Sequence, residues 1–206
     1  DAAPHIEATL TATSKVHGRV SREYAEALRN AHLYRFGRGE LVEAEALARA
    51  TLEIQRSLGG DDDELAIESE VMLANCLAAK QQFTDAETLL RGAVAARERL
   101  ATLETEQGVV ALNSLAVTLH RLGQLDEAEV LYRQSLALGE RVNGVEHVDT
   151  LTARMNLGSM LHSRGKDAEA EPILVAMREA IPRVFGPDHL HSASSAFVLA
   201  TFYRDL

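Results

Sequence analysis

The sequence repeats itself with a period of 42 residues, and this period constrains the fold more than any other feature. An acidic–alanine–acidic triplet occurs four times in one phase, with no insertion or deletion between copies. The triplets are Glu43-Ala44-Glu45, Asp85-Ala86-Glu87, Glu127-Ala128-Glu129 and Glu169-Ala170-Glu171. A period of this length indicates a stack of similar supersecondary units.

Glycines and small residues keep the same phase. Two glycine positions and one apolar–small pair recur in most units, while Gln81 and Thr102 replace glycine once each. The series are Gly39, Gly123 and Gly165; Gly18, Gly60, Gly144 and Gly186; and Leu73-Ala74, Leu115-Ala116, Leu157-Gly158 and Leu199-Ala200. Several independent features in one register exclude a chance repeat.

Each unit divides into two amphipathic helices. In the last complete unit, apolar residues follow helical spacing over 150–165 and again over 166–186. Asp149 is the expected N-cap of the first helix, and Gly165 suits the left-handed residue that closes it. The composition agrees, because Ala and Leu are abundant and only four prolines are present.

The small residues predict how the helices pack. Small side chains on both helices allow two antiparallel helices to approach closely, and short turns favour that arrangement. One pair cannot bury its apolar face alone, so the pairs must stack. The predicted fold class is therefore all-α, a right-handed α-solenoid of antiparallel helix pairs.

The period also predicts the domain organisation. We expect one array over 1–206. The repeat pattern is clearest in the later units and least clear near Arg35, where other units have leucine. The predicted divisions are a partial unit 1–17, units at about 18–59, 60–101, 102–143 and 144–185, and a partial unit 186–206. Neither end shows an obvious polar capping helix, so we expect a fragment of a longer protein.

Charge and cysteine content limit the partners. The formal net charge is −10, which argues against binding to nucleic acid or to anionic membranes. The longest uncharged stretch, 108–119, is too short to span a bilayer, and no signal peptide is visible. Cys76 is the single cysteine and cannot form an intrachain disulfide. These features predict a cytoplasmic protein.

No catalytic motif is present. The GxG at Gly37 and Gly39 follows no strand, and P-loop, HExxH and GxSxG patterns are absent. The acidic run 61–64 lies directly before a helix, where it complements the helix dipole. His189 and His191 share a loop, but His147 matches His189 one period earlier, which favours a structural role. We therefore predict no enzyme activity, no cofactor and no metal.

The segments 112–142 and 140–190 resemble tetratricopeptide repeats of the 42-residue type found in kinesin light chains. The resemblance covers essentially the whole chain. It implies two-helix repeats, a right-handed superhelix and a concave groove that binds peptides. It implies no catalysis and names no partner.

Helical spacing selects the side chains that would line such a groove. The candidates combine amides, imidazoles and apolar groups; they are Asn75, Asn113, Val117, His120, Arg121, Met155, Asn156, Ser159 and His162. Val71 and Phe197 are further candidates for contacting the side chains of a partner. Asparagine amides donate to and accept from a peptide backbone. His120 and His162 occupy equivalent positions, where protonation near pH ~6.5 would change their charge.

The leading hypothesis is a protein–protein interaction scaffold or adaptor that binds a peptide or partner protein in the concave groove. The alternative is a self-associating structural or regulatory module of a larger bacterial signalling protein, a homo-oligomer formed through uncapped repeat ends. A remote third hypothesis is a metal-binding protein or an enzyme without a recognisable motif.

Overall fold

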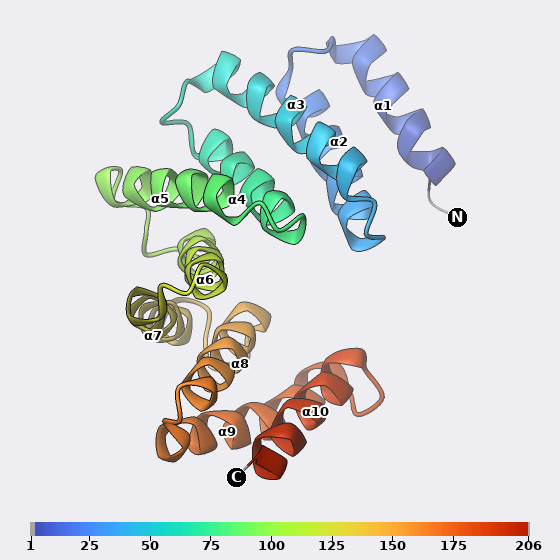
Figure 1. The fold of residues 1–206 in the computed structure, drawn as a ribbon. Coiled ribbons are helices and arrows are strands. Elements are labelled where there is room, and N and C mark those ends of the chain that lie inside the picture. Colours follow the sequence, from blue (N-terminus) through green and yellow to red (C-terminus); the bar gives the residue numbers. More distant parts are fainter. Residues whose placement is uncertain (1–2, 206) are drawn as a thin grey trace. The chain divides into compact units, whose positions relative to one another are not determined.

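The computed structural model describes residues 3–205, although the side chains of residues 3, 4, 190 and 191 lie outside that description. Over this range all regular structure is α-helical (Figure 1). The helices are α1 (Ala3–His17), α2 (Arg22–Gly37), α3 (Leu41–Gly59), α4 (Glu64–Ala79), α5 (Phe83–Arg99), α6 (Glu106–Arg121), α7 (Leu125–Val142), α8 (Val148–Ser163), α9 (Asp167–Phe185) and α10 (Leu190–Asp205).

The helix starts recur with the period of the sequence. From α2 onward, each even-numbered helix begins 42 residues after the previous one, and from α3 onward so does each odd-numbered helix. We call the even-numbered helices first helices and the odd-numbered helices second helices. The phase is kept even around Arg35, because the turns on both sides have constant length. The predicted fold class, an all-α solenoid of antiparallel helix pairs, is confirmed.

The described chain forms two compact units. The first ends at Leu100 and contains α1–α5, and the second begins at Ala101 and contains α6–α10. Within each unit, every helix packs against the next one along the chain. In the second unit, the first helices also contact one another directly, α6 against α8 and α8 against α10.

The alanine of each triplet is a buried residue of the second helix. Ala44, Ala86, Ala128 and Ala170 are all fully buried. The facing position on the first helix is also small, and Ala74 and Ala116 are fully buried there. At Gly158 there is no room for a side chain, because an added β-carbon would lie 2.5 Å from Leu174 Cδ2. Backbone proximity therefore selects the small residues.

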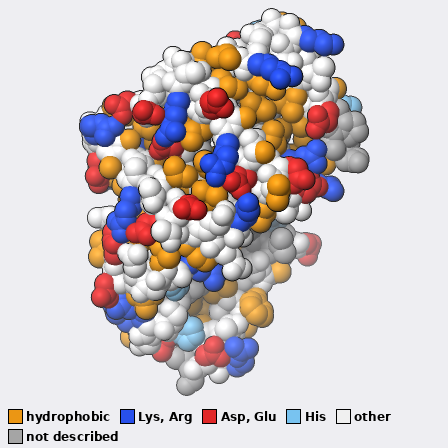
Figure 2. Space-filling view, turned by 45° about the horizontal axis from the view of Figure 1, so that its top comes forward, with side chains coloured by type: hydrophobic (Ala, Val, Ile, Leu, Met, Phe, Trp, Pro, Cys, Tyr) orange, Lys and Arg blue, Asp and Glu red, His pale blue; other side chains and the backbone are white. Residues whose placement is uncertain are grey.

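The last acid of the triplet ties neighbouring repeats together. Glu129 on α7 accepts hydrogen bonds from Arg164 and Lys166, both at 2.8 Å, as well as from Arg133 one turn away. In the first unit, Glu45 pairs in the same way with Lys80. These cations hold the pKa of both carboxyls below the usual range, with the lysine hydrogen bond as the main cause. Figure 2 shows acidic and basic side chains interspersed over the face drawn.

The N-caps of the first helices also recur every 42 residues, at Ser21, Asp63, Thr105 and His147. Each side chain accepts a hydrogen bond from a backbone N–H in the first turn. The expected cap at Asp149 was wrong. His147 takes the position because the imidazole Nδ1 reaches the Asp149 N–H at 3.3 Å, and Asp149 lies inside the helix.

One repeat breaks the small-residue rule. His32 stands on α2 where later first helices have Ala74, Ala116 and Gly158. The ring is 2% exposed, its Nδ1 donates to the Ala44 carbonyl at 2.8 Å, and it stacks on Phe36. Burial lowers the pKa of His32, although the hydrogen bond to Ala44 opposes this effect. The pair α2–α3 therefore contains a buried imidazole between its helices, bonded to the backbone of α3.

We predict opposite effects for two glycine-to-alanine substitutions. Gly158→Ala will destabilise the protein by about 1–3 kcal/mol, because the new methyl group overlaps Leu174. Gly92→Ala, in the middle of α5 with no atom near the new methyl group, will stabilise it by about 0.5–1 kcal/mol. Urea unfolding of both variants measures the two changes. Changes in unfolding free energy of the same sign in both variants would contradict the proposed close approach of α8 and α9.

We also predict that His32 makes the protein acid-sensitive. Because its pKa is lowered in the folded state, the unfolded state binds a proton more readily. The stabilisation is complete above the ordinary histidine pKa of about 6.5 and is lost as the pH falls toward the lowered value. His32→Ala will therefore show a smaller loss of unfolding free energy between pH 7.5 and 5.5 than the parent. Equal losses in the two proteins would contradict this.

Candidate protein-binding surface

The second unit places most of the predicted groove residues on one row of helices. Asn113, Val117, His120 and Arg121 lie on α6, and Met155, Asn156, Ser159 and His162 lie on α8. Because α6 and α8 contact each other directly, their facing side chains form one continuous wall. Asn75 lies on α4 in the first unit, so it is not a member of the wall in the second unit.

Two predicted residues meet. The Asn156 side-chain Nδ2 donates to Asn113 Oδ1 at 3.1 Å, although the residues are 43 positions apart. Both side chains are half-buried. The bond uses one donor of Asn156 and one acceptor of Asn113, so the Asn113 Nδ2 and the Asn156 Oδ1 keep their own hydrogen-bonding capacity. The pair is therefore a fixed amide platform with a donor and an acceptor.

Apolar and hydroxyl groups flank the amide pair. Val117, Met155 and Ser159 are all half-buried, so each presents part of its surface to solvent. Phe197 on α10 is 69% exposed and adds an aromatic ring to the second unit. Val71 on α4 behaves differently, since it is only 6% exposed and packs in the core. The predicted role of Val71 as a seat for a partner side chain is therefore wrong.

His120 is held neutral. Its ring lies edge-on to the Tyr132 ring, with centroids 6.2 Å apart. Burial lowers the pKa of His120, and the neighbouring Arg121 guanidinium lowers it further. Arg121 itself is exposed on the last turn of α6. This end of the wall therefore combines a neutral imidazole with a cationic side chain.

His162 occupies the equivalent position on α8 but has acidic neighbours. Its Nδ1 lies 2.7 Å from Asp167 Oδ1, and its Nε2 lies 3.8 Å from Asp205 Oδ2. The ring also meets Phe202 edge-on at 5.0 Å between centroids. The two equivalent histidines therefore have different charged neighbours, which are Arg121 on α6 for His120 and Asp167 on α9 with Asp205 on α10 for His162.

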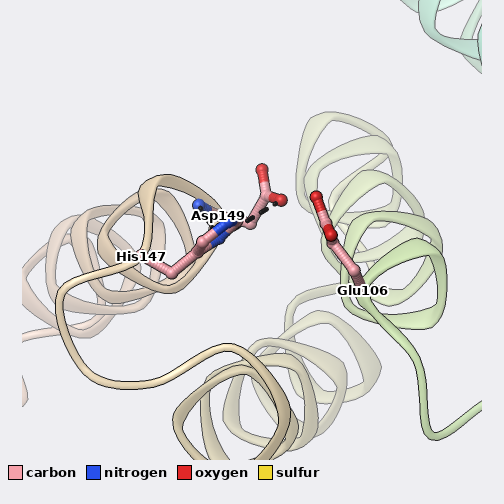
Figure 3. Close-up of side chains that lie close together, drawn as sticks. All are labelled: Glu106, His147 and Asp149. Carbon is pink, nitrogen blue, oxygen red and sulfur yellow. Dashed lines mark hydrogen bonds and ion pairs between the residues drawn. The ribbon is translucent and has the colours of Figure 1, made fainter.

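A second cluster lies where α6 and α8 begin. Figure 3 shows the carboxylates of Glu106 and Asp149 pointing toward each other, with His147 beside Asp149. One potential ligand atom from each of the three residues lies within 4.8 Å of the others. Burial raises the pKa of Asp149, and the Glu106 carboxylate raises it further against the opposing influence of His147. Sequence reasoning missed this cluster, because its members come from different repeats.

The cluster fits a helix-capping role better than a cation site. The His147 Nδ1 already accepts the Asp149 N–H, so that nitrogen is engaged in capping the helix. Two helix N-termini also meet here, and their dipoles favour carboxylates and disfavour cations. The matching His189 stacks on Phe185 with ring centroids 5.1 Å apart, and the side chain of His191 lies outside the described residues.

Known proteins resemble this chain in sequence pattern and in fold. The family model for the tetratricopeptide repeat matches residues 109–180. No curated protein matches the chain in sequence. None of the described helices combines the length and the apolar character that crossing a bilayer requires.

Solved structures match most of the chain. BtubC (BKLC) from P. vanneervenii superposes with a TM-score of 0.76 at 18% identity, covering 98% of this chain and 80% of that one. A Podosopora anserina protein described as a kinesin light chain with nearly identical TPR-like repeats superposes with a TM-score of 0.67 at 21% identity, covering 86% of this chain and 84% of that one. Aspartyl phosphate phosphatase F from Bacillus subtilis gives 0.77 at 14%, covering 98% of this chain and 50% of that one. At these identities, the likeness shows the fold.

We predict that Arg121→Gln raises the pKa of His120. The substitution removes the positive charge that opposes protonation and leaves the burial of the ring unchanged. An NMR titration of the His120 ring signals in both proteins measures the change. An unchanged or lower pKa in the variant would show that Arg121 does not act on this ring.

Proposed function

We propose that this chain, which matches the tetratricopeptide-repeat family model over residues 109–180 and is similar in fold to kinesin-light-chain-like repeats, is a protein–protein interaction scaffold. Its working surface is the wall formed by α6 and α8 in the second unit. The partner is an extended peptide or a peptide-like segment of another protein. The observation that carries this proposal is the amide pair Asn113–Asn156.

The amide pair suits a peptide backbone. A backbone presents an N–H and a C=O at every residue, and the pair offers an acceptor on Asn156 and a donor on Asn113. The hydrogen bond between the two side chains restricts their rotation before a partner arrives. Less conformational entropy is then lost on binding, which favours affinity.

The neighbouring side chains would select the partner sequence. Val117 and Met155 offer apolar surface, and methionine adapts its shape to different side chains. Ser159 and the neutral His120 add polar contacts without a net charge. Arg121 is the cationic group at this end of the wall, in a chain whose formal net charge is −10. A partner is therefore held by backbone contacts at the centre and selected at the flanks.

The proposal also specifies the class of partner, the absence of catalysis and the cellular compartment. A protein partner is favoured over nucleic acid, because the formal net charge would repel a phosphate backbone. The half-buried and buried groups of the wall provide no arranged nucleophile and base, so we propose binding without catalysis. We place the protein in the cytoplasm, where a buried free thiol such as Cys76 stays reduced.

We predict that the double variant Asn113→Ala/Asn156→Ala binds its peptide at least tenfold more weakly. Peptides are first selected from a random display library on the parent protein, and their affinities for parent and variant are then measured by calorimetry. The melting temperature should change little, because a partly exposed hydrogen bond contributes about 0.5–1.5 kcal/mol. The matched control is Gln134→Ala, which removes an exposed amide from α7.

The control should keep full affinity. A double variant that binds as well as the parent would remove the amide pair from the site. A double variant that unfolds would show that the pair is structural. Selected peptides whose affinity falls equally with Gln134→Ala would place the binding surface elsewhere.

A further inference from the structure

Arg121 differs from most arginines of the second unit because no carboxylate of the described chain pairs with it. Ion pairs with carboxylates hold the arginines Arg133, Arg141, Arg154, Arg164, Arg183 and Arg204. Within the described residues, Arg121 makes neither a hydrogen bond nor an ion pair, and it is exposed in the last turn of α6. The equivalent positions one period away hold Ala79 and Ser163, so this cation is a departure from the repeat.

His120, the residue before Arg121, has polar atoms that the chain leaves unused. Neither ring nitrogen forms a hydrogen bond in the part of the chain that the structure describes, and the half-buried ring keeps both accessible. Burial lowers the pKa of His120, and the Arg121 guanidinium lowers it further, so the ring is neutral at pH 7. A neutral imidazole has one donor, and a protonated imidazole has two.

Among the described residues, the groups that face His120 supply no negative charge. On α7, the Tyr132 ring lies edge-on to it, and burial raises the pKa of Tyr132, so the phenol stays uncharged. On α8, the equivalent His162 has its two ring nitrogens beside Asp167 and Asp205. The two histidines therefore occupy one position of the repeat, and only the one on α8 has carboxylate neighbours.

We propose that His120 and Arg121 form a subsite for one carboxylate side chain, from an aspartate or glutamate of the partner peptide, and that His120 takes up a proton as this carboxylate binds. The inference rests on the proposed function, since it assigns one end of the same α6–α8 wall. Arg121 supplies a fixed cation whose fork of donors matches a carboxylate. The protonated ring adds a charge-assisted hydrogen bond, and the C-terminal end of α6 favours the charged ring.

One peptide segment can reach both the amide pair and the subsite. Between Asn113 and Arg121, α6 rises by about 12 Å, which an extended peptide spans with about four residues. A side chain reaches the exposed Arg121 without ending the peptide there, so the segment can belong to a longer protein. The formal net charge of −10 opposes carboxylates at other places on the partner, so the chain selects a single acidic residue at this position.

Binding and protonation are linked at this subsite. A bound carboxylate favours the imidazolium and raises the pKa of His120 from its lowered value in the free protein. Between these two values, binding takes up part of a proton, and the affinity rises as the pH falls. Below the lower value the ring is already protonated before binding, so the affinity no longer changes with pH. Acidification therefore strengthens the complex.

Calorimetry with peptides selected from the random display library tests the subsite. Each peptide is amidated at its C-terminus and compared with a version in which its acidic residue is replaced by the corresponding amide. We expect the selected peptides to share one acidic position, and the amide versions to bind about tenfold more weakly. Arg121→Gln should cause a similar loss for the acidic peptide and little further loss for the amide version.

The matched control is Arg178→Gln. This arginine of α9 also lacks an ion pair among the described residues, so its substitution removes the same charge without breaking a bond. The control variant should bind both peptides as the parent does. A general effect of net charge would instead weaken the acidic peptide in both variants.

Proton uptake is measured by repeating the titrations in phosphate and in Tris buffer, which differ in ionisation enthalpy. The parent should take up a fraction of one proton with the acidic peptide, and its affinity should rise about threefold or more between pH 8 and pH 6. Both effects should disappear with His120→Gln and with the amide peptide. Circular dichroism at each pH confirms that the proteins are folded, which separates these effects from the acid sensitivity of His32.

Four results would overturn the subsite. They are full affinity of the amide peptides, equal losses for both peptides with Arg121→Gln, binding without proton uptake, and a dependence on the terminal carboxylate in place of the side chain. Peptides that need the amide pair but ignore Arg121 would refute only this inference. Peptides that need Arg121 but bind the Asn113→Ala/Asn156→Ala variant normally would refute only the role of the amide pair. If no peptide binds, both proposals fail.

Discussion

The close approach of two backbones within each helix pair is the constraint on which the rest of the structure depends. Fully buried alanines on the second helices, such as Ala86 and Ala128, meet small residues on the first helices. This contact fixes the distance and the angle of the pair, and short turns fix its direction. The apolar face left over on each pair can be buried only by the next pair. A repeating small residue is therefore enough to generate a solenoid.

The fold could be predicted from the sequence because its determinants are local and recur. The 42-residue period fixed the helix starts, and even the divergent unit around Arg35 kept its phase. Side chains that break the period could not be predicted in the same way. His32 occupies a small-residue position, and Arg97 is fully buried with its Nη1 paired to Glu64. Neither follows from the repeat, since each depends on neighbours that the period does not specify.

In the candidate site, too, some features follow from the repeat and others do not. The period alone does not predict the Asn113–Asn156 contact, because these residues are 43 positions apart and so hold adjacent, not identical, positions of the repeat on neighbouring first helices. The difference between His120 and His162 could not be predicted either, because it arises from Arg121 and Asp167 outside the shared positions. The capping cluster was missed for a related reason. Its residues lie at the starts of two first helices, and spacing along one helix does not bring them together.

Equivalent positions therefore keep one geometry while their chemistry changes from repeat to repeat. The position of Gly158 holds a histidine in the first repeat, alanine in the next two and an exposed alanine on α10. In the first case it carries a buried titratable ring, and in the last it is a small exposed side chain. A solenoid can vary one position in this way because each repeat packs mainly against its neighbours, so a local change is not transmitted along the array. Function in such a chain is set by the departures from the repeat, and the repeat itself supplies the fixed spacing between them.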